Sequence, residues 1–147
     1  MIISDSNNII AIYKINASNA YQKMYSSPVA ANGYVFGVSN CAFYINRTNS
    51  ILYRVSTTNY SSVTNYSFVK LKLQPVAIAS DNGTVIVYNK NTVNVSNGSF
   101  YVFNEQLSFA TYISCSFIDF NSAISKLVSI SYSSAHSAIL RTTNSSI

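Results

Sequence analysis

The sequence predicts an all-β fold, an antiparallel β-sandwich of about seven to nine strands formed by a single domain over residues 1–147. Short runs rich in β-branched and aromatic residues recur along the chain, and turn residues interrupt them every 8 to 12 positions or so. Apolar spacing typical of an amphipathic helix is poor throughout. A chain of this length is also able to bury a hydrophobic core of its own.

Local sequence predicts the individual elements. Residues 17–27, ASNAYQKMYSS, and 121–130, NSAISKLVSI, have a weak helical spacing, but we expect loop and strand in both. Residues 33–45, GYVFGVSNCAFYI, predict two strands joined at Ser39-Asn40. In residues 68–73, FVKLKL, Lys70 and Lys72 are expected to share one face of an edge strand.

Two hairpins follow. Residues 75–88, PVAIASDNGTVIVY, predict a hairpin closed by Asp81-Asn82-Gly83. Residues 93–103, VNVSNGSFYVF, predict another that turns at Asn97-Gly98, because both residues of an Asn-Gly pair accept positive φ.

Three stretches of the chain have a similar pattern, with candidate units at residues 9–50, 51–98 and 99–147. Each opens with an aliphatic-aromatic strand, continues through a polar loop and reaches a second apolar run. In the first two units that run begins Pro-Val-Ala, at Pro28 and Pro75. The units begin 42 and 49 residues apart, at Ile9, Ile51 and Phe100.

This period, with three to four strands per unit, resembles a β-propeller blade of the WD40, kelch and quinoprotein-like families. The Trp-Asp dipeptide of such blades is absent, since the chain has no Trp. The resemblance implies an alternative fold, three blade-like units that belong to a larger propeller or pair with a second copy. Propellers close with about 4–8 blades, so three would leave open edges.

The composition is unusually poor in charge. Asp, Glu, Lys and Arg make up 9% of the residues, against about 25% in an ordinary soluble domain. Ser, Asn, Thr and Tyr must therefore cover much of the surface. With Asp5, Asp81, Glu105 and Asp119 as the only acidic side chains, protonation in acid should cost little stability. Such a surface suits an extracellular location.

Eight Asn-x-Ser/Thr triplets predict covalent N-glycans, and they lie at Asn16, Asn46, Asn59, Asn65, Asn82, Asn94, Asn97 and Asn144. About four would be expected from the composition alone, and two of the eight coincide with Asn-Gly turn signals, where a bulky glycan is tolerated. The N-terminal residues do not have the pattern of a signal peptide. The chain is therefore a mature or excised piece, is exported by another route, or stays in the cytosol with unused triplets.

Cys41 and Cys115 form an even pair, which in a secreted domain predicts a disulfide; the alternative is two small buried hydrophobic residues. His136 is the single histidine, so a zinc site lacks ligands at suitable spacing. The sequence contains no paired carboxylates, no G-x-S-x-G and no phosphate-binding glycine motif. We expect no enzymatic activity, no cofactor and no metal.

The net charge of +5 comes mainly from a shortage of acids, and without a Lys/Arg run we expect no nucleic-acid partner. No apolar run is long enough to predict a membrane span. Tyrosines at alternate strand positions, including Tyr34, Tyr44, Tyr53 and Tyr101, are expected to pack in the core; the alternative is a Tyr-rich binding face.

Taken whole, the composition resembles the Asn/Ser/Thr/Tyr-rich, charge-poor surface proteins of thermoacidophilic archaea and their viruses. The resemblance implies a non-enzymatic, extracellular structural module of a surface layer, filament or virion, whose partners are other copies of itself or other surface proteins. The alternative function is an adhesion module that recognises a glycan or a protein through its Tyr-rich face.

Overall fold

The computed structural model of the chain describes the backbone of residues 1–37, 40–81, 83–94, 97–116, 124–132 and 138–144. About 60% of the chain is strand, and the described residues contain no α-helix. The all-β prediction is therefore confirmed.

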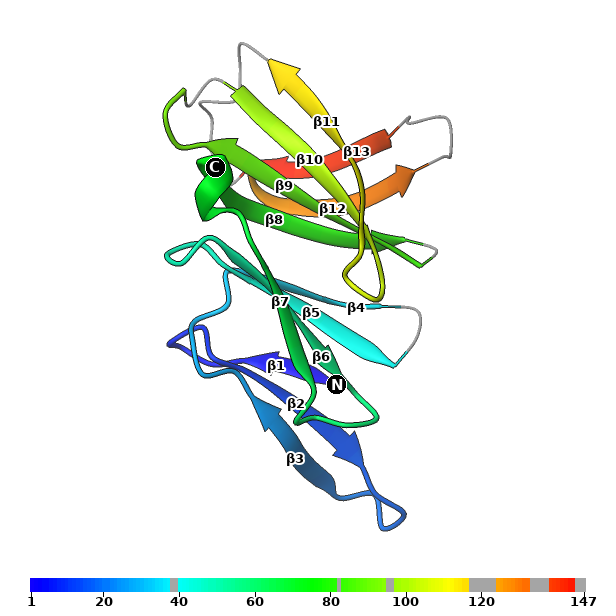
Figure 1. Cartoon of the computed structure of the whole chain (residues 1–147). Helices are drawn as coiled ribbons and strands as arrows, with labels where there is room; N and C mark the ends of the chain where they lie inside the picture. The colour runs from blue at the N-terminus through cyan, green and yellow to red at the C-terminus, as the bar shows by residue number, and fades with distance from the viewer. Residues whose placement is uncertain (38–39, 82, 95–96, 117–123, 133–137, 145–147) are drawn as a thin grey trace.

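Four antiparallel sheets follow one another along the chain (Figure 1). The first sheet contains β1 (Ile2–Ser4), β2 (Ile10–Ile15) and β3 (Tyr21–Ser26). The second contains β4 (Gly33–Phe36), β5 (Cys41–Asn46), β6 (Ile51–Ser56) and β7 (Val63–Ser67). The third contains β8 (Leu73–Asp81), β9 (Thr84–Asn91), β10 (Asn97–Asn104) and β11 (Phe109–Ser116), and the fourth β12 (Ile124–Tyr132) and β13 (Ala138–Asn144).

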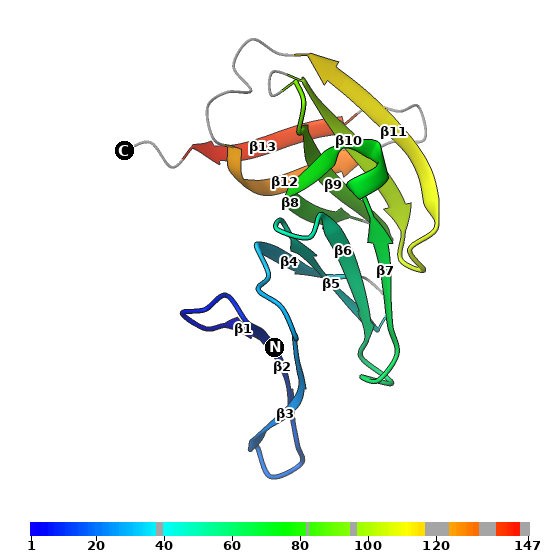
Figure 2. The ribbon, with the colours of Figure 1, turned by 60° about the vertical axis from the view of Figure 1, so that its left-hand side comes forward.

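Each sheet is a meander, in which strands that are consecutive in sequence are hydrogen-bonded neighbours. Figures 1 and 2 show the first three sheets stacked in chain order, and β12 of the fourth sheet lies beside β8. The second and third sheets form a two-layer sandwich of eight strands, as predicted. Four-stranded meanders that pack in chain order are also the units of a β-propeller.

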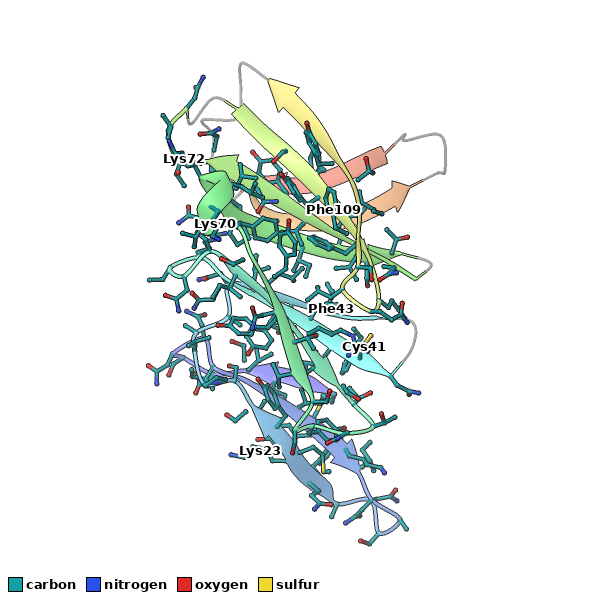
Figure 3. All side chains as sticks on the ribbon, in the orientation of Figure 1. Lys23, Cys41, Phe43, Lys70, Lys72 and Phe109 are labelled. Carbon is teal, nitrogen blue, oxygen red and sulfur yellow. The ribbon has the colours of Figure 1, made fainter. Side chains whose placement is uncertain are left out.

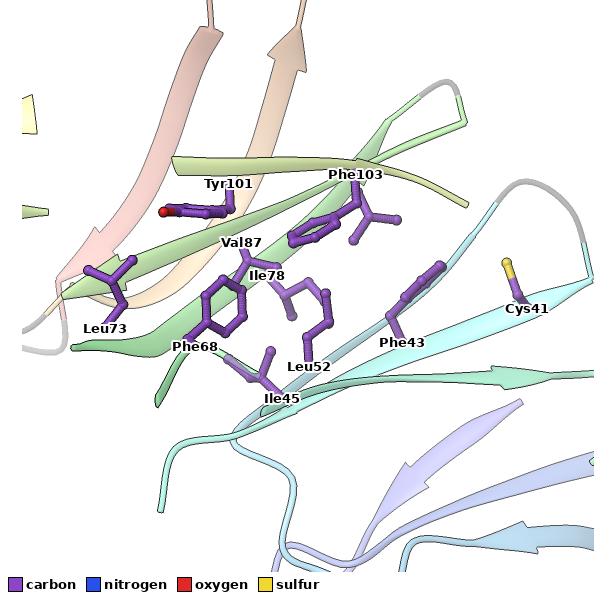
Figure 4. Close-up of a cluster of buried hydrophobic side chains, with 11 residues drawn as sticks. Cys41, Phe43, Ile45, Leu52, Phe68, Leu73, Ile78, Val87, Tyr101 and Phe103 are labelled. Carbon is purple, nitrogen blue, oxygen red and sulfur yellow. The ribbon is translucent and has the colours of Figure 1, made fainter. Parts of the chain in front are cut away.

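The main hydrophobic core lies between the second and third sheets (Figure 4). Every second residue of β5 and β9 points into it, because strand side chains alternate between faces. Its buried members are Cys41, Phe43, Ile45, Leu52, Phe68, Leu73, Ile78, Val87, Val85, Tyr101 and Phe103.

Phe68 occupies the point where the chain passes from the second sheet to the third. It is fully buried and precedes a single 3₁₀ turn, η1 (Val69–Leu71). Its ring meets Tyr101 edge to face, with centroids 5.4 Å apart and planes at 89°. The backbone N–H of Phe68 donates to the Ser50 carbonyl at 2.9 Å, which fixes the crossing to the β5–β6 turn.

A second core lies between the first and second sheets, where Tyr25, Tyr53 and Tyr60 pack around the buried Tyr44 and its aliphatic neighbours. Strand register places Tyr34, Tyr44 and Tyr53 side by side across β4, β5 and β6. The rings of Tyr44 and Tyr53 are stacked with centroids 4.7 Å apart. The Tyr44 hydroxyl shares a 2.9 Å hydrogen bond with that of Tyr25 on β3, which ties the first sheet to the second.

Several local predictions agree with the structure. Residues 17–27 and 121–130 contribute the strands β3 and β12, and residues 33–45 form β4 and β5. The hairpin of residues 75–88 forms with Gly83 at φ 77°, although Asn82 lies outside the described residues. The units predicted at 9–50, 51–98 and 99–147 have different boundaries from the sheets, since residue 50 lies within the second sheet and residue 98 within β10.

Two local predictions are wrong. Asn97 and Gly98 do not form a turn but begin β10, where Gly98 pairs with Lys90 and with Cys115. A glycine is needed there for space, because a Cβ atom would lie 2.7 Å from the Tyr88 ring. The chain turns earlier, where the Asn91 side chain accepts hydrogen bonds from the next backbone N–H groups.

The predicted edge strand at Lys70 and Lys72 is the second error. Lys70 lies in η1, and Lys72 ends it in the left-handed conformation at φ 54° (Figure 3). Burial of Phe68 requires the chain to turn sharply between the two sheets, so alternation in FVKLKL does not produce a strand.

The tyrosine core predicts loss of stability in alkali. Burial raises the pKa of Tyr44, and burial also raises the pKa of Tyr25. Because the folded state holds these phenols neutral, their contribution is complete below the unfolded pKa near 10 and is lost as pH rises above it. We expect the free energy of unfolding to fall above about pH 9–10, by up to about 1.4 kcal/mol per pH unit for each phenol. Urea unfolding at pH 7, 9 and 11 measures it.

Tyr44→Phe should make that alkaline decline shallower, and Tyr21→Phe, at an exposed position, serves as the control for loss of one phenol. Equal alkaline slopes for the wild type and Tyr44→Phe would contradict the prediction.

Candidate functional site

The strand β2 is apolar on both of its faces. Ile10 and Ile12 point toward the second sheet and are buried, whereas Ala11, Tyr13 and Ile15 alternate with them and point away. Strands with continuous apolar sequence are typically covered on both sides. The central strand β5 fits that rule, since all six of its residues are buried.

The first sheet therefore has an uncovered apolar surface, which we call the outer face: Ile3, Ala11, Tyr13, Ile15 and Tyr21. Strand register pairs Ile3 with Ala11 and Ile15 with Tyr21, so these side chains share one side of the sheet. Ile3, Ile15 and Tyr21 are 45%, 54% and 61% exposed. Ile10 and Ile12, which pack with the second sheet, lie on the opposite side of β2.

The tip of the β2–β3 hairpin shows the same preference clearly. The neighbouring cross-strand pair, Lys14 with Gln22, lies on the inner side of the first sheet, which is the side of Ile10 and Ile12. Both residues of the pair are exposed. Polar residues thus occupy the inner side of the tip, where the second sheet does not reach, and Ile15 and Tyr21 occupy the outer side. That distribution is opposite to the one expected if water were the outer face's only neighbour.

A wedge opens beside the outer face, between the first sheet and one end of the second, with a volume of about 630 Å³. Met1, Met24, Phe36 and Tyr60 are among the residues that line it. Methionine adapts its shape easily and is common at protein-binding surfaces. The wedge thus extends the apolar surface around the edge of the first sheet.

The outer face carries little charge. Among the described residues, register places Lys23 on it, opposite Tyr13, and the N-terminal ammonium of Met1 lies beside it, where it donates to the Tyr13 carbonyl at 2.9 Å (Figure 3). The described residues contain no cluster of His, Cys, Asp and Glu that could hold a metal ion. Among these same residues, no helix is long and apolar enough to cross a membrane. The surface is suited to contact with another apolar surface.

The four tyrosines singled out in the sequence do not form one face. Tyr44 and Tyr53 pack between the first and second sheets, and Tyr101 packs between the second and third. Tyr34, at the edge strand β4, is partly exposed. Three of the four therefore serve mainly in the cores, and Tyr34, Tyr44 and Tyr53 form a row only within the second sheet.

The predicted glycan acceptors differ in accessibility. Asn16, Asn59, Asn65 and Asn94 are exposed. Asn46 is 3% exposed, and its Nδ2 donates to the Ala30 carbonyl at 2.7 Å. A glycan attached there would break this bond and displace the packed chain.

The remaining acceptors, Asn82, Asn97 and Asn144, lie outside the residues whose side chains are described. At Asn16, the side-chain oxygen accepts from the N–H of Ser18 and of Ala20, which closes the β2–β3 turn. Its Nδ2, the atom that would carry the glycan, is not used in this turn.

Cys41 carries a free, buried thiol at the start of β5. A Cβ atom on Gly37 would lie 2.6 Å from its Sγ and 2.7 Å from Glu105 Oε1, so the thiol and the carboxylate are close together. Arg54 Nε donates to the Glu105 carbonyl. Burial, followed by the negative charge of Glu105, raises the pKa of the Cys41 thiol, which makes it a poor nucleophile at neutral pH.

The Cys41–Cys115 bridge remains a prediction that strand register does not favour. The backbone of Cys115 is opposite Gly98, at the start of β10, whereas Glu105 beside Cys41 follows the end of that strand. The two ends of β10 are separated by on the order of 20 Å at about 3.4 Å per residue. A disulfide needs Cα atoms within about 7 Å. The Cys115 side chain, like His136, lies outside the described residues.

Sequence reasoning missed the outer face. The signal was present in IAIYKI, whose two apolar faces predict burial on both sides, but the pattern alone does not say which neighbour is absent.

No protein-family model matches the sequence, and a search of curated proteins finds no significant match.

The accessibility of the acceptors predicts selective glycosylation. In chain secreted from a host that adds N-glycans, we expect occupancy at Asn16, Asn59, Asn65 and Asn94, and none at Asn46, whose Nδ2 is buried and bonded. Glycopeptide mass spectrometry of the folded fraction measures each site. Substantial occupancy of Asn46 in protein with the native circular-dichroism spectrum would contradict the prediction.

Proposed function

We propose that the chain is a non-enzymatic structural module of an extracellular surface assembly, and that it assembles by packing its outer face against the outer face of a second copy. The observation that carries the proposal is the uncovered apolar side of the first sheet, with Ile3, Ile15 and Tyr21 exposed.

The chain already uses this kind of contact twice. The first sheet packs on the second, and the second on the third, through aliphatic and aromatic side chains. Burying apolar area stabilises by about 25 cal/mol per Å², so a third sheet-on-sheet contact would be favourable. The outer face extends the same stack by one more layer.

A second copy is the occupant best supported by charge. The outer face carries Lys23 and adjoins the N-terminal ammonium, and none of the residues that define it is acidic, so it offers an ionic partner little to bind. Two copies related by a two-fold axis would bring identical apolar surfaces together, which is the commonest symmetry of homo-oligomers. The wedge beside the face could receive side chains at the rim of such a contact.

An extracellular location and attached glycans belong to the same proposal. The surface of hydroxyl and amide groups stays uncharged over a wide pH range, and four acceptor asparagines are exposed. Stacking of four-stranded meanders in chain order also supports a role in which sheets add to sheets, either in a filament or in a larger propeller-like ring.

The proposal predicts concentration-dependent dimerisation of the unglycosylated chain. Ile15→Lys should weaken the dimer by at least about tenfold, because it places a charge in the apolar contact. Both substitutions, Ile15→Lys and the control Val69→Lys, are at exposed positions and should leave folding stability within about 0.5 kcal/mol. Sedimentation equilibrium measures the dissociation constant.

Val69 is 59% exposed in η1, away from the outer face, so Val69→Lys should dimerise like the wild type. A wild-type chain that stays monomeric at its highest soluble concentration would overturn the proposal. A dimer that Ile15→Lys leaves intact would show that another surface is used.

A further inference from the structure

A separate hollow of about 250 Å³ lies at one end of the third sheet, beside η1. Leu71 and Leu73 form its apolar wall, Asn91 and Ser99 supply polar groups, and Tyr101 and Tyr112 supply rings. Pockets for drug-sized ligands measure about 300–1,000 Å³, so this hollow suits a smaller molecule, of about one ring.

Its most informative atom is Ser99 Oγ. Ser99 is 7% exposed and lines the hollow, yet within the described part of the chain its hydroxyl has no hydrogen-bond partner. On the adjacent strand, Asn89 is directly opposite Ser99, and its fully buried Oδ1 also lacks a partner among the described residues. Buried polar groups are nearly always paired in native proteins, and an exception calls for a ligand or a water.

The aromatic side of the hollow is a stacked pair. The rings of Tyr101 and Tyr112 have centroids 5.6 Å apart and an interplanar angle of 21°. Tyr101 is buried and supports Tyr112, which is 58% exposed. Figure 4 shows the Tyr101 hydroxyl directed away from Phe103 and toward the Leu73 end of the core. The pair thus offers a rigid ring face with hydroxyl groups at its edge.

Asn91 is held in place by its own loop. Its Oδ1 accepts from the N–H groups of Val93, at 2.8 Å, and Asn94, at 3.0 Å. The amide is therefore ordered before any ligand arrives, with Nδ2 as its donor. Fixed polar groups lower the entropic cost of binding.

We propose that this hollow binds a neutral saccharide, one pyranose residue of a glycan. The apolar C–H side of the sugar would lie on the Tyr112 ring, whose face is electron-rich. Sugar hydroxyl groups would pair with Ser99 Oγ and Asn91 Nδ2. None of the described residues that line the hollow is charged, which argues against a phosphate or a carboxylate as the recognised group. This site is independent of the outer face.

The test is titration of unglycosylated chain with methyl glycosides of glucose, mannose, galactose and N-acetylglucosamine, followed by NMR. At least one should bind saturably, with a dissociation constant on the order of 1–10 mM. Tyr112→Ala should weaken binding by at least about tenfold, and Tyr34→Ala, a partly exposed tyrosine outside the hollow, should not.

Ser99→Ala separates binding from a structural role. Because the hydroxyl has no protein partner to lose within the described residues, the variant should unfold at the same or a higher temperature while it binds sugar several-fold more weakly. Lower thermal stability with unchanged binding would show that Ser99 serves the fold. Absence of saturable binding to all four glycosides, or binding of uridine in their place, would overturn the proposal.

Discussion

The packing of the second sheet against the third, with Phe68 at the crossing between them, is the contact on which the rest of the structure depends. Phe68 meets side chains of both sheets, including Tyr66 on β7 and Tyr101 on β10. Removal of a buried phenylalanine ring costs about 3–5 kcal/mol, a large share of the 5–15 kcal/mol by which domains are usually stable. The first sheet packs on the second sheet of this sandwich, and β12 lies beside β8 of the third sheet.

Because the chain has few ions, hydrogen bonds to backbone carbonyls hold the two central sheets in register. Arg47 Nη2 donates to the Val76 carbonyl at 2.8 Å, and Ser80 Oγ donates to the Phe36 carbonyl at 2.7 Å. Arg54 makes the corresponding contact to Glu105 at the opposite edge. Such links do not depend on an acidic partner, so a charge-poor surface is compatible with a precisely aligned sandwich.

The sequence predicted the strands well wherever local pattern and tertiary packing agree. GYVFGVSNCAFYI produces β4 and β5, because the apolar and aromatic runs there coincide with an alternating edge strand and with a central strand that is buried on both faces. Prediction from local sequence was wrong where tertiary packing overrides local preference. FVKLKL alternates like a strand, but burial of Phe68 forces a 3₁₀ turn. Asn97-Gly98 has the composition of a hairpin turn, yet the Tyr88 ring needs a residue without Cβ inside β10.

The two candidate sites were beyond local pattern for a different reason. The outer face consists of residues whose apolar nature is visible in the sequence. The sequence does not show which side of the first sheet packs on the second sheet and which side is left exposed. The hollow combines η1, β8, β9, β10 and β11, and the Ser99 hydroxyl, which has no partner among the described residues, is recognised only once these elements are placed together. The N-glycan acceptors show the same limit, since the triplet at Asn46 looks like the others until its side chain is seen to be buried.

The most direct test of the central contact is equilibrium unfolding of Phe68→Ala beside Phe36→Ala, a phenylalanine that is 44% exposed. The structure predicts a loss of about 3–5 kcal/mol for Phe68→Ala and less than about 1 kcal/mol for Phe36→Ala. All probes of strand and tyrosine environment should report one shared, earlier transition for Phe68→Ala. Equal, small losses for the two variants would contradict the claim that this packing holds the fold together.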